Sequence, residues 1–219
     1  MNFINKIILI TAVGIINLIH AQKIDNKAKG ILDAVSANYK SKNTLYFKFS
    51  YGTGSGKISK NQTGSFYTSK DKYKLKIMGN EQIFDGIKTY SINEDEQEIT
   101  IAKQNSKETL SPINYIDSYK KGYNIYYIGK NKNLDIIKLT PTKNNGIKEV
   151  FLYVNTSKNN VEKIEQYSTD KHITTITITE YKENPKVDSK NLASKLGEMV
   201  DKFFEQIMTQ LAIMIAKLS

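Results

Sequence analysis

The chain of 219 residues contains no cysteine and no tryptophan, and only two histidines. Without cysteine it can form no disulfide, so its stability must come from the burial of side chains. Cysteine nucleophiles are excluded for the same reason. Structural zinc sites are excluded as well, because they need several His, Cys or carboxylate ligands at ligand spacing and only His172 lies outside the N-terminal segment. We expect no metal and no cofactor.

Arginine is also absent, so all 32 basic residues are lysine and the formal net charge is +10. Arginine supplies the forked pair of donors that recognises phosphate and guanine, and lysine offers only a point charge. The sequence therefore predicts a solvated, lysine-rich surface and no nucleic-acid partner.

The first 21 residues have the organisation of a secretory signal peptide. Lys6 precedes an apolar run at residues 7–19, and the small residue Ala21 stands before Gln22. The apolar run is shorter than the roughly 20 residues that a membrane span needs. We expect cleavage after Ala21 and a mature protein in the periplasm.

Residues 24–39 place apolar side chains at helical spacing, and from residue 45 the period changes to two. Short strand-like runs then recur between turn residues, with Asp85-Gly86 as the strongest hairpin signal. Besides residues 45–50, the runs are residues 57–59, 65–68, 73–78, 82–84, 88–92, 98–102, 125–128, 134–139, 150–154, 161–167 and 173–181. This pattern predicts an antiparallel sheet of about eleven strands in one domain, residues 22–188.

Three further segments complete the predicted organisation. The glycine-rich residues 52–56 are expected to form a loop, and Ser111-Pro112 is expected to begin a short helix through Tyr119. Residues 192–218 repeat apolar positions three and four apart, which predicts a long amphipathic helix in a separate C-terminal part, residues 189–219. This helix either covers the open side of the sheet, pairs with another copy, or rests on a membrane surface.

Catalytic patterns are weak in this chain. His172 follows Asp170 and Lys171 between two predicted strands, which favours an exposed turn over a catalytic base, so a hydrolase is the least favoured function. The acidic residues 94–96 lack the ligand order of a calcium loop. We expect no enzyme, and a sheet whose apolar face is either an ordinary filled core or a hollow site for an apolar ligand.

Ten short segments, in this order, resemble the outer-membrane lipoprotein carrier protein (LolA) family across residues 23–188. They are ILDAVS (31–36), LYFKF (45–49), GSFY (64–67), KYKL (72–75), FDG (84–86), TY (89–90), EQEI (96–99), LSP (110–112), LTP (139–141) and YKENP (181–185). The resemblance implies an α+β fold, an incomplete antiparallel β-barrel with helices covering its concave face, and a cavity that receives acyl chains. The implied partners are acylated lipoproteins, an inner-membrane lipoprotein-releasing transporter and an outer-membrane acceptor.

Two departures from the family stand out. Lys70 lies nearest to the position where the family has an arginine that contacts the lid, and lysine has no forked donor. The family's closing strand is replaced by the predicted helix at residues 192–218, which is a candidate surface for self-association.

The resulting hypothesis is a periplasmic carrier that binds the acyl chains of lipoproteins and moves them from the inner to the outer membrane. The alternative is a module of the same fold that senses acyl chains or envelope stress without transport. The residues predicted to line the acyl cavity are Phe47, Phe49, Phe66, Tyr73, Leu75, Phe84 and Tyr90 from the strands, with Ile31 and Val35 from the first helix.

Overall fold

The computed structural model describes residues 22–69, 72–93, 96, 98–103, 116–117, 121–185, 205 and 208–209. The chain divides into two units, Met1–Glu183 and Asn184–Ser219. The fold below is that of the first unit.

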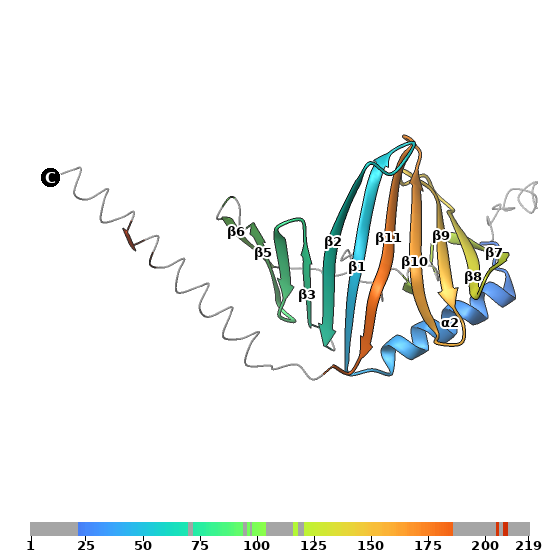
Figure 1. Ribbon diagram of the computed structural model, residues 1–219, viewed down its shortest axis with the longest axis horizontal. Helices are drawn as coiled ribbons and strands as arrows, with labels where there is room; N and C mark the ends of the chain where they lie inside the picture. The colour runs from blue at the N-terminus through green and yellow to red at the C-terminus, as the bar shows by residue number, and fades with distance from the viewer. Residues whose placement is uncertain are drawn as a thin grey trace, which may run out of the picture. The chain divides into compact units, whose positions relative to one another are not determined.

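A single antiparallel sheet of eleven strands dominates this unit (Figure 1). The strand order is β6-β5-β4-β3-β2-β1-β11-β10-β9-β8-β7. The strands are β1 (Thr44–Ser55), β2 (Lys60–Ser69), β3 (Lys72–Ile77), β4 (Asn80–Phe84), β5 (Lys88–Asn93), β6 (Glu98–Lys103), β7 (Tyr123–Asn131), β8 (Leu134–Pro141), β9 (Ile147–Asn155), β10 (Asn160–Ser168) and β11 (His172–Glu183). The predicted number of strands is confirmed.

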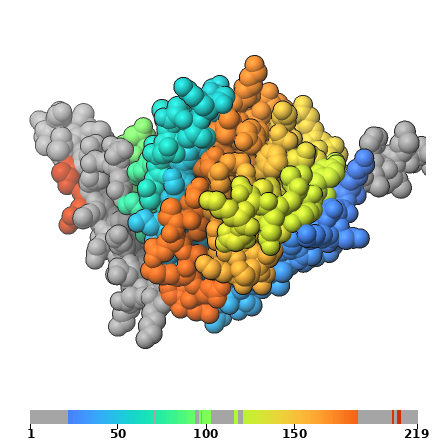
Figure 2. Space-filling model, turned by 45° about the vertical axis from the view of Figure 1, so that its right-hand side comes forward, coloured from blue at the N-terminus to red at the C-terminus, as the bar shows by residue number. Residues whose placement is uncertain are grey.

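Two meanders, β1 to β6 and β7 to β11, join through the antiparallel pairing of β1 with β11. Figure 2 shows the two strands in direct contact, β1 in cyan and β11 in orange. No pairing connects β6 to β7 among the described strands, so the sheet is open. This confirms the incomplete barrel that the family resemblance implied.

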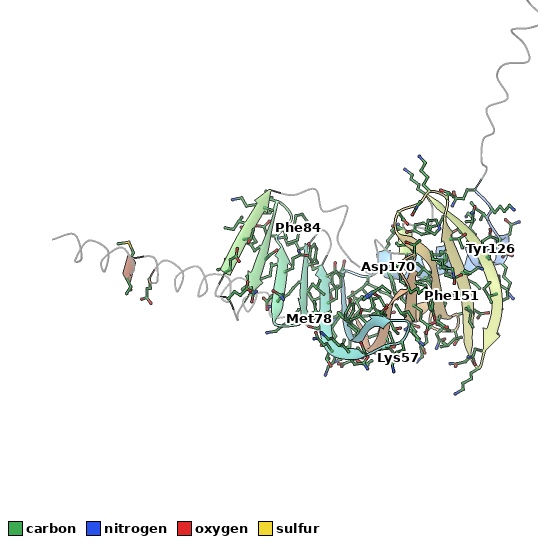
Figure 3. The ribbon with its side chains drawn as sticks, turned by 90° about the horizontal axis from the view of Figure 1, so that it is seen from above. Lys57, Met78, Phe84, Tyr126, Phe151 and Asp170 are labelled. Atoms are coloured by element: carbon green, nitrogen blue, oxygen red, sulfur yellow. The ribbon has the colours of Figure 1, made fainter. Side chains whose placement is uncertain are left out.

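Helix α2 (Asn26–Lys40) covers one face of the sheet and contacts β7 and β10. Seen from above, the sheet is curved and α2 lies on its concave side (Figure 3). The side chain of Asp25 caps the helix by accepting a hydrogen bond of 2.9 Å from the Ala28 N–H. The predicted helix began at residue 24, but Ile24 instead bridges to Ile125 in β7.

The face that α2 covers is called the inner face below. Strand alternation brings a row of aromatic rings onto it, one from each of β1, β2, β3 and β4, and Tyr39 of α2 continues the row. Adjacent centroids are 5.5, 6.4, 5.8 and 5.6 Å apart along the row, which runs Tyr39, Phe47, Phe66, Tyr73 and Phe84. These separations are those of contacting rings, so the row forms a continuous part of the core.

Two predictions about the β1–β2 hairpin are wrong. Residues 52–55 belong to β1 although a loop was expected, and residues 57–59, expected as a strand, form the loop between β1 and β2 (Figure 3 labels Lys57). The loop folds back over β1, where Ser59 donates a backbone hydrogen bond of 3.0 Å to the Thr53 carbonyl. A Cβ on Gly54 would lie 2.8 Å from the Ser59 nitrogen. The glycines therefore permit close backbone approach within a strand.

Other expected elements lie wholly or partly outside the described residues. Ile116 and Asp117 are helical, as predicted for the short helix after Pro112. The signal peptide at residues 1–21 and Lys70 are not described, and of the predicted C-terminal helix only residues 205, 208 and 209 are, each with a helical backbone and an exposed side chain. Within the described part of the chain, no helix is long and apolar enough to cross a membrane.

Candidate functional site

An apolar cavity of about 90 Å³ lies on the inner face, at the centre of the sheet. Its walls come from the end of α2, from Ile116, and from strands β1, β2, β3, β10 and β11. The lining residues are Tyr39, Phe47, Phe49, Tyr51, Phe66, Leu75, Ile77, Ile116, Val161, Ile164, Ile176 and Ile178. No charged side chain is among them, so the cavity suits a hydrocarbon ligand.

Gly64 in β2 makes room for one wall of this cavity. It pairs with Phe49 across the β1–β2 ladder, and a Cβ at this position would lie 2.5 Å from the Phe49 Cζ atom and 2.9 Å from the Lys76 carbonyl oxygen. Real side chains do not approach so closely. Glycine at position 64 therefore allows the Phe49 ring to lie where it does.

Contacts with α2 hold Ile116 in place above the strands. Ser36 donates a hydrogen bond of 2.8 Å to the Asp117 carboxylate, and Lys40 forms an ion pair of 2.6 Å with the same group. Ile116 is 1% exposed. The residue that follows Ile116 is thus tied to the helix, and the side chain of Ile116 completes the cavity.

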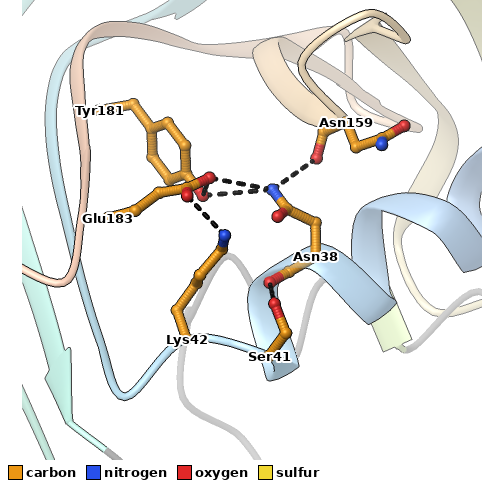
Figure 4. A network of polar contacts seen from close by, with 6 residues as sticks. All are labelled: Asn38, Ser41, Lys42, Asn159, Tyr181 and Glu183. Atoms are coloured by element: carbon orange, nitrogen blue, oxygen red, sulfur yellow. Dashed lines mark hydrogen bonds and ion pairs between the residues drawn. The ribbon is translucent and has the colours of Figure 1, made fainter.

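A polar network fastens the C-terminal end of α2 to the end of β11 (Figure 4). Asn38 Nδ2 donates to the Asn159 carbonyl at 3.2 Å and to Glu183 at 3.3 Å, and Lys42 pairs with Glu183 at 2.6 Å. The hydrogen bond from Lys42 holds the pKa of Glu183 below its ordinary value. Tyr181 also donates to Glu183, at 3.0 Å, and burial raises the pKa of Tyr181.

The structure brings most of the predicted site residues to one face. Phe47, Phe49, Phe66 and Leu75 line the cavity. Tyr73 and Phe84 on the inner face, and Val35 and the partly buried Ile31 on α2, belong to the surrounding core and do not line the cavity.

The prediction for Tyr90 is wrong. Across β4 and β5, Phe84 pairs with Thr89, and Tyr90 pairs with Ile83. Paired residues share a face, so Thr89 lies on the inner face and Tyr90 on the outer one. The Tyr90 hydroxyl donates to Asp85 at 3.2 Å on that outer face. Tyr90 therefore cannot line the cavity.

Sequence reasoning missed two thirds of the lining. From β11 it missed Ile176 and Ile178, which alternate with threonines and pair with Tyr51 and Phe49. The alternation was visible in the sequence, but the pairing of β1 with β11 was not. The other missed residues are Tyr39, Tyr51, Ile77, Ile116, Val161 and Ile164.

A second hollow, of about 450 Å³, lies farther along the sheet on β3 to β6. Leu75 and Ile77 line both spaces, so the two are adjacent. The inner-face residues that line only the second hollow are polar: Asn80, Gln82, Ser91, Asn93, Glu98 and Thr100. The inner face thus passes from an apolar region to a polar one.

Residues that could carry other chemistry are placed as follows. His172 is exposed at the start of β11, and its Nε2 atom forms a hydrogen bond with Thr53 Oγ1. In the described ranges, no three His, Asp or Glu side chains come together as a possible metal site.

Comparisons with known proteins agree with this geometry. The family model described as "Outer membrane lipoprotein carrier protein LolA" matches residues 36–193. An uncharacterised conserved protein from Thermus thermophilus is similar in fold, with a TM-score of 0.54 and 9% identity, over 75% of this chain and 92% of its own.

Two other solved structures match with lower scores. A LolA superfamily protein from Nitrosomonas europaea has a TM-score of 0.39 and 11% identity, over 74% of this chain and 96% of its own. LprF from Mycobacterium bovis has a TM-score of 0.43 and 10% identity, over 74% of this chain and 95% of its own. No curated protein matches this chain.

Proposed function

Because the chain belongs to the outer membrane lipoprotein carrier (LolA) family, we propose that it binds acyl chains of lipoproteins and carries them through the periplasm toward the outer membrane. The supporting observation is the apolar cavity between Ile116, the end of α2 and the central strands. We propose binding without chemistry, so that the cargo leaves unchanged. The inner-membrane transporter and outer-membrane acceptor implied by the family belong to the same proposal.

The energetics of acyl chains explain why a carrier is needed. At about 0.8 kcal/mol per buried CH₂ group, a chain of ~15 methylenes opposes transfer into water by ~12 kcal/mol. A protein that offers an apolar surface lowers this barrier. An anchor with several chains would otherwise leave its membrane far too slowly.

The size of the cavity suits the partial enclosure of one acyl chain. Pockets that bury a drug-sized ligand measure roughly 300–1,000 Å³, and this cavity measures about 90 Å³. It has room for a segment of one chain, with the remainder along the inner face. A shallow site of this kind favours release, which a carrier requires.

The test uses two neighbouring residues of β11 that point to opposite faces. Ile176 lines the cavity, whereas Thr177 pairs with Ser50 and Lys163 on the outer face. Ile176→Asp places a carboxylate in apolar surroundings, where it has no partner, and Thr177→Asp adds the same charge to the opposite face.

We expect Ile176→Asp to weaken the binding of a fluorescent long-chain fatty acid at least tenfold and Thr177→Asp to change it less than about twofold. Circular dichroism and thermal melting confirm that both variants are folded. Equal binding by the two variants contradicts the proposal. A transfer assay with purified lipoprotein and outer-membrane vesicles then separates a carrier, which delivers its cargo, from a sensing module, which retains it.

A further inference from the structure

The inner-face residues that line only the hollow on β3 to β6 are all polar, and the lining also includes Glu81 and Ile92, which have the outer register. Asn80, Gln82 and Asn93 are carboxamides, each of which both donates and accepts hydrogen bonds. Ser91 and Thr100 face each other across the β5–β6 pair and add two hydroxyl groups. Such groups match the amide, ester and hydroxyl groups of an uncharged polar ligand.

The charge of this surface is unusual for a chain with 32 basic residues. Among the described residues no lysine lines the hollow; its charged lining residues are Glu81 and Glu98, and of these two only Glu98 lies on the inner face by strand register. Lys74 and Lys76 belong to β3 but lie on the outer face, where Lys74 pairs with Glu81 at 2.5 Å. The hollow therefore disfavours an anionic ligand and accepts a neutral or cationic one.

The position of the hollow relates it to the acyl site. Leu75 and Ile77 separate the two spaces and line both, so a ligand can extend from one into the other. On the far side lies β6, the last strand of the sheet, which has no further strand beyond it among the described residues. A chain that leaves the hollow over β6 therefore meets no further strand of the described sheet.

We propose that this hollow binds the first peptide groups of an acylated protein whose acyl chain lies in the apolar cavity, and that it selects a neutral or cationic peptide. The inference rests on the proposed function, because it needs an acyl chain in the neighbouring cavity. The carboxamides pair with peptide groups, and the remainder of the cargo protein leaves past β6.

The test compares two probes, a fluorescent fatty acid and a synthetic triacylated lipopeptide with the peptide Cys-Ser-Lys-Lys-Lys-Lys. The variant Gln82→Leu/Ser91→Val removes polar groups from the hollow. The control Ser65→Val makes the serine-to-valine part of this change on the outer face, where Ser65 pairs with Lys48 and Lys76.

We expect the double variant to bind the lipopeptide about tenfold more weakly, which corresponds to ~1.4 kcal/mol, and the fatty acid within about twofold of the parent protein. Ser65→Val should bind both probes as the parent does. An unchanged affinity for the lipopeptide, or equal losses for both probes, overturns this inference. If the parent binds neither probe, the proposed function itself fails.

A third probe, a neutral glycolipid with the same acyl chains as the lipopeptide, tests whether the polar group in the hollow is a peptide. A loss of glycolipid affinity in the double variant without a loss of lipopeptide affinity overturns the peptide assignment. A lipopeptide ending in four aspartates tests the charge preference, and we expect it to bind more weakly than the lysine form. The reverse order contradicts the role of Glu98.

Discussion

The backbone N–H of Val161 donates a hydrogen bond of 3.0 Å to the phenolic oxygen of Tyr39. Val161 lies in β10, next to an irregularity in its pairing with β9, and Tyr39 is in the last turn of α2. A side chain of the helix thus satisfies a buried backbone donor of the sheet. Burial raises the pKa of Tyr39 above its ordinary value, so the neutral form is favoured in the folded protein.

Tyr39→Phe should destabilise the protein, because it leaves the N–H of Val161 buried without this partner. We expect a loss of about 1–3 kcal/mol in the free energy of unfolding, measured by urea denaturation. Tyr46→Phe is the control, since Tyr46 lies on the outer side of β1, and it should cost less than about 0.5 kcal/mol. Similar losses of unfolding free energy in the two variants would show that the hydrogen bond between Tyr39 and Val161 does not stabilise the packing of α2 on the sheet.

The stability that Glu183 contributes by joining α2 to β11 should depend on pH. The hydrogen bond from Lys42 lowers the pKa of Glu183, so the folded state favours the ionised carboxylate. The resulting stability is present above the unfolded-state pKa of roughly 4.3 and is lost as the pH falls through the lower folded-state value. We expect Glu183→Gln to lower the unfolding free energy at pH 7 and to lose this effect at pH 3. An equal difference at both pH values argues against the ion pair.

Two glycine substitutions should change the stability of the protein in opposite directions. Gly64→Ala forces the Phe49 ring out of its place in the cavity wall and meets the backbone at Lys76, so we expect a loss of about 1–3 kcal/mol together with weaker acyl-probe binding. Gly30→Ala lies within α2 with open space around it, and it should stabilise the protein by about 0.5–1 kcal/mol. Thermal unfolding and probe titration measure both effects. A neutral Gly64→Ala contradicts the described packing.

The strand pattern and the aromatic core were predictable because they follow from local periodicity. Phe47 and Phe49 alternate with polar residues in β1, and the same alternation places Phe66 opposite Phe47. The Asp85-Gly86 turn was predictable for a similar reason, since Gly86 has a φ of 102° and Asp85 accepts hydrogen bonds from the two residues after the glycine.

The inward face of β5 could not be read from its own sequence. The alternation there separates the apolar Tyr90 and Ile92 from the polar Thr89 and Ser91, and apolar residues normally face the core. Phe84 lies on the inner face and pairs with Thr89, so the register of β4 with β5 places Thr89 and Ser91 on the inner face. The pairing of β1 with β11 was equally hidden, because it joins residues from opposite ends of the described sheet.

The most direct test of the central claim locates a bound acyl chain by methyl NMR of the isoleucine side chains, using a fatty acid that carries a nitroxide on its chain. Ile164, Ile176 and Ile178 line the cavity, whereas Ile101 lies on the outer face and is 59% exposed. We predict that the first three methyl signals broaden at stoichiometric ligand and that the signal of Ile101 stays sharp. Broadening of Ile101 while the three cavity signals stay sharp would contradict an acyl site on the inner face.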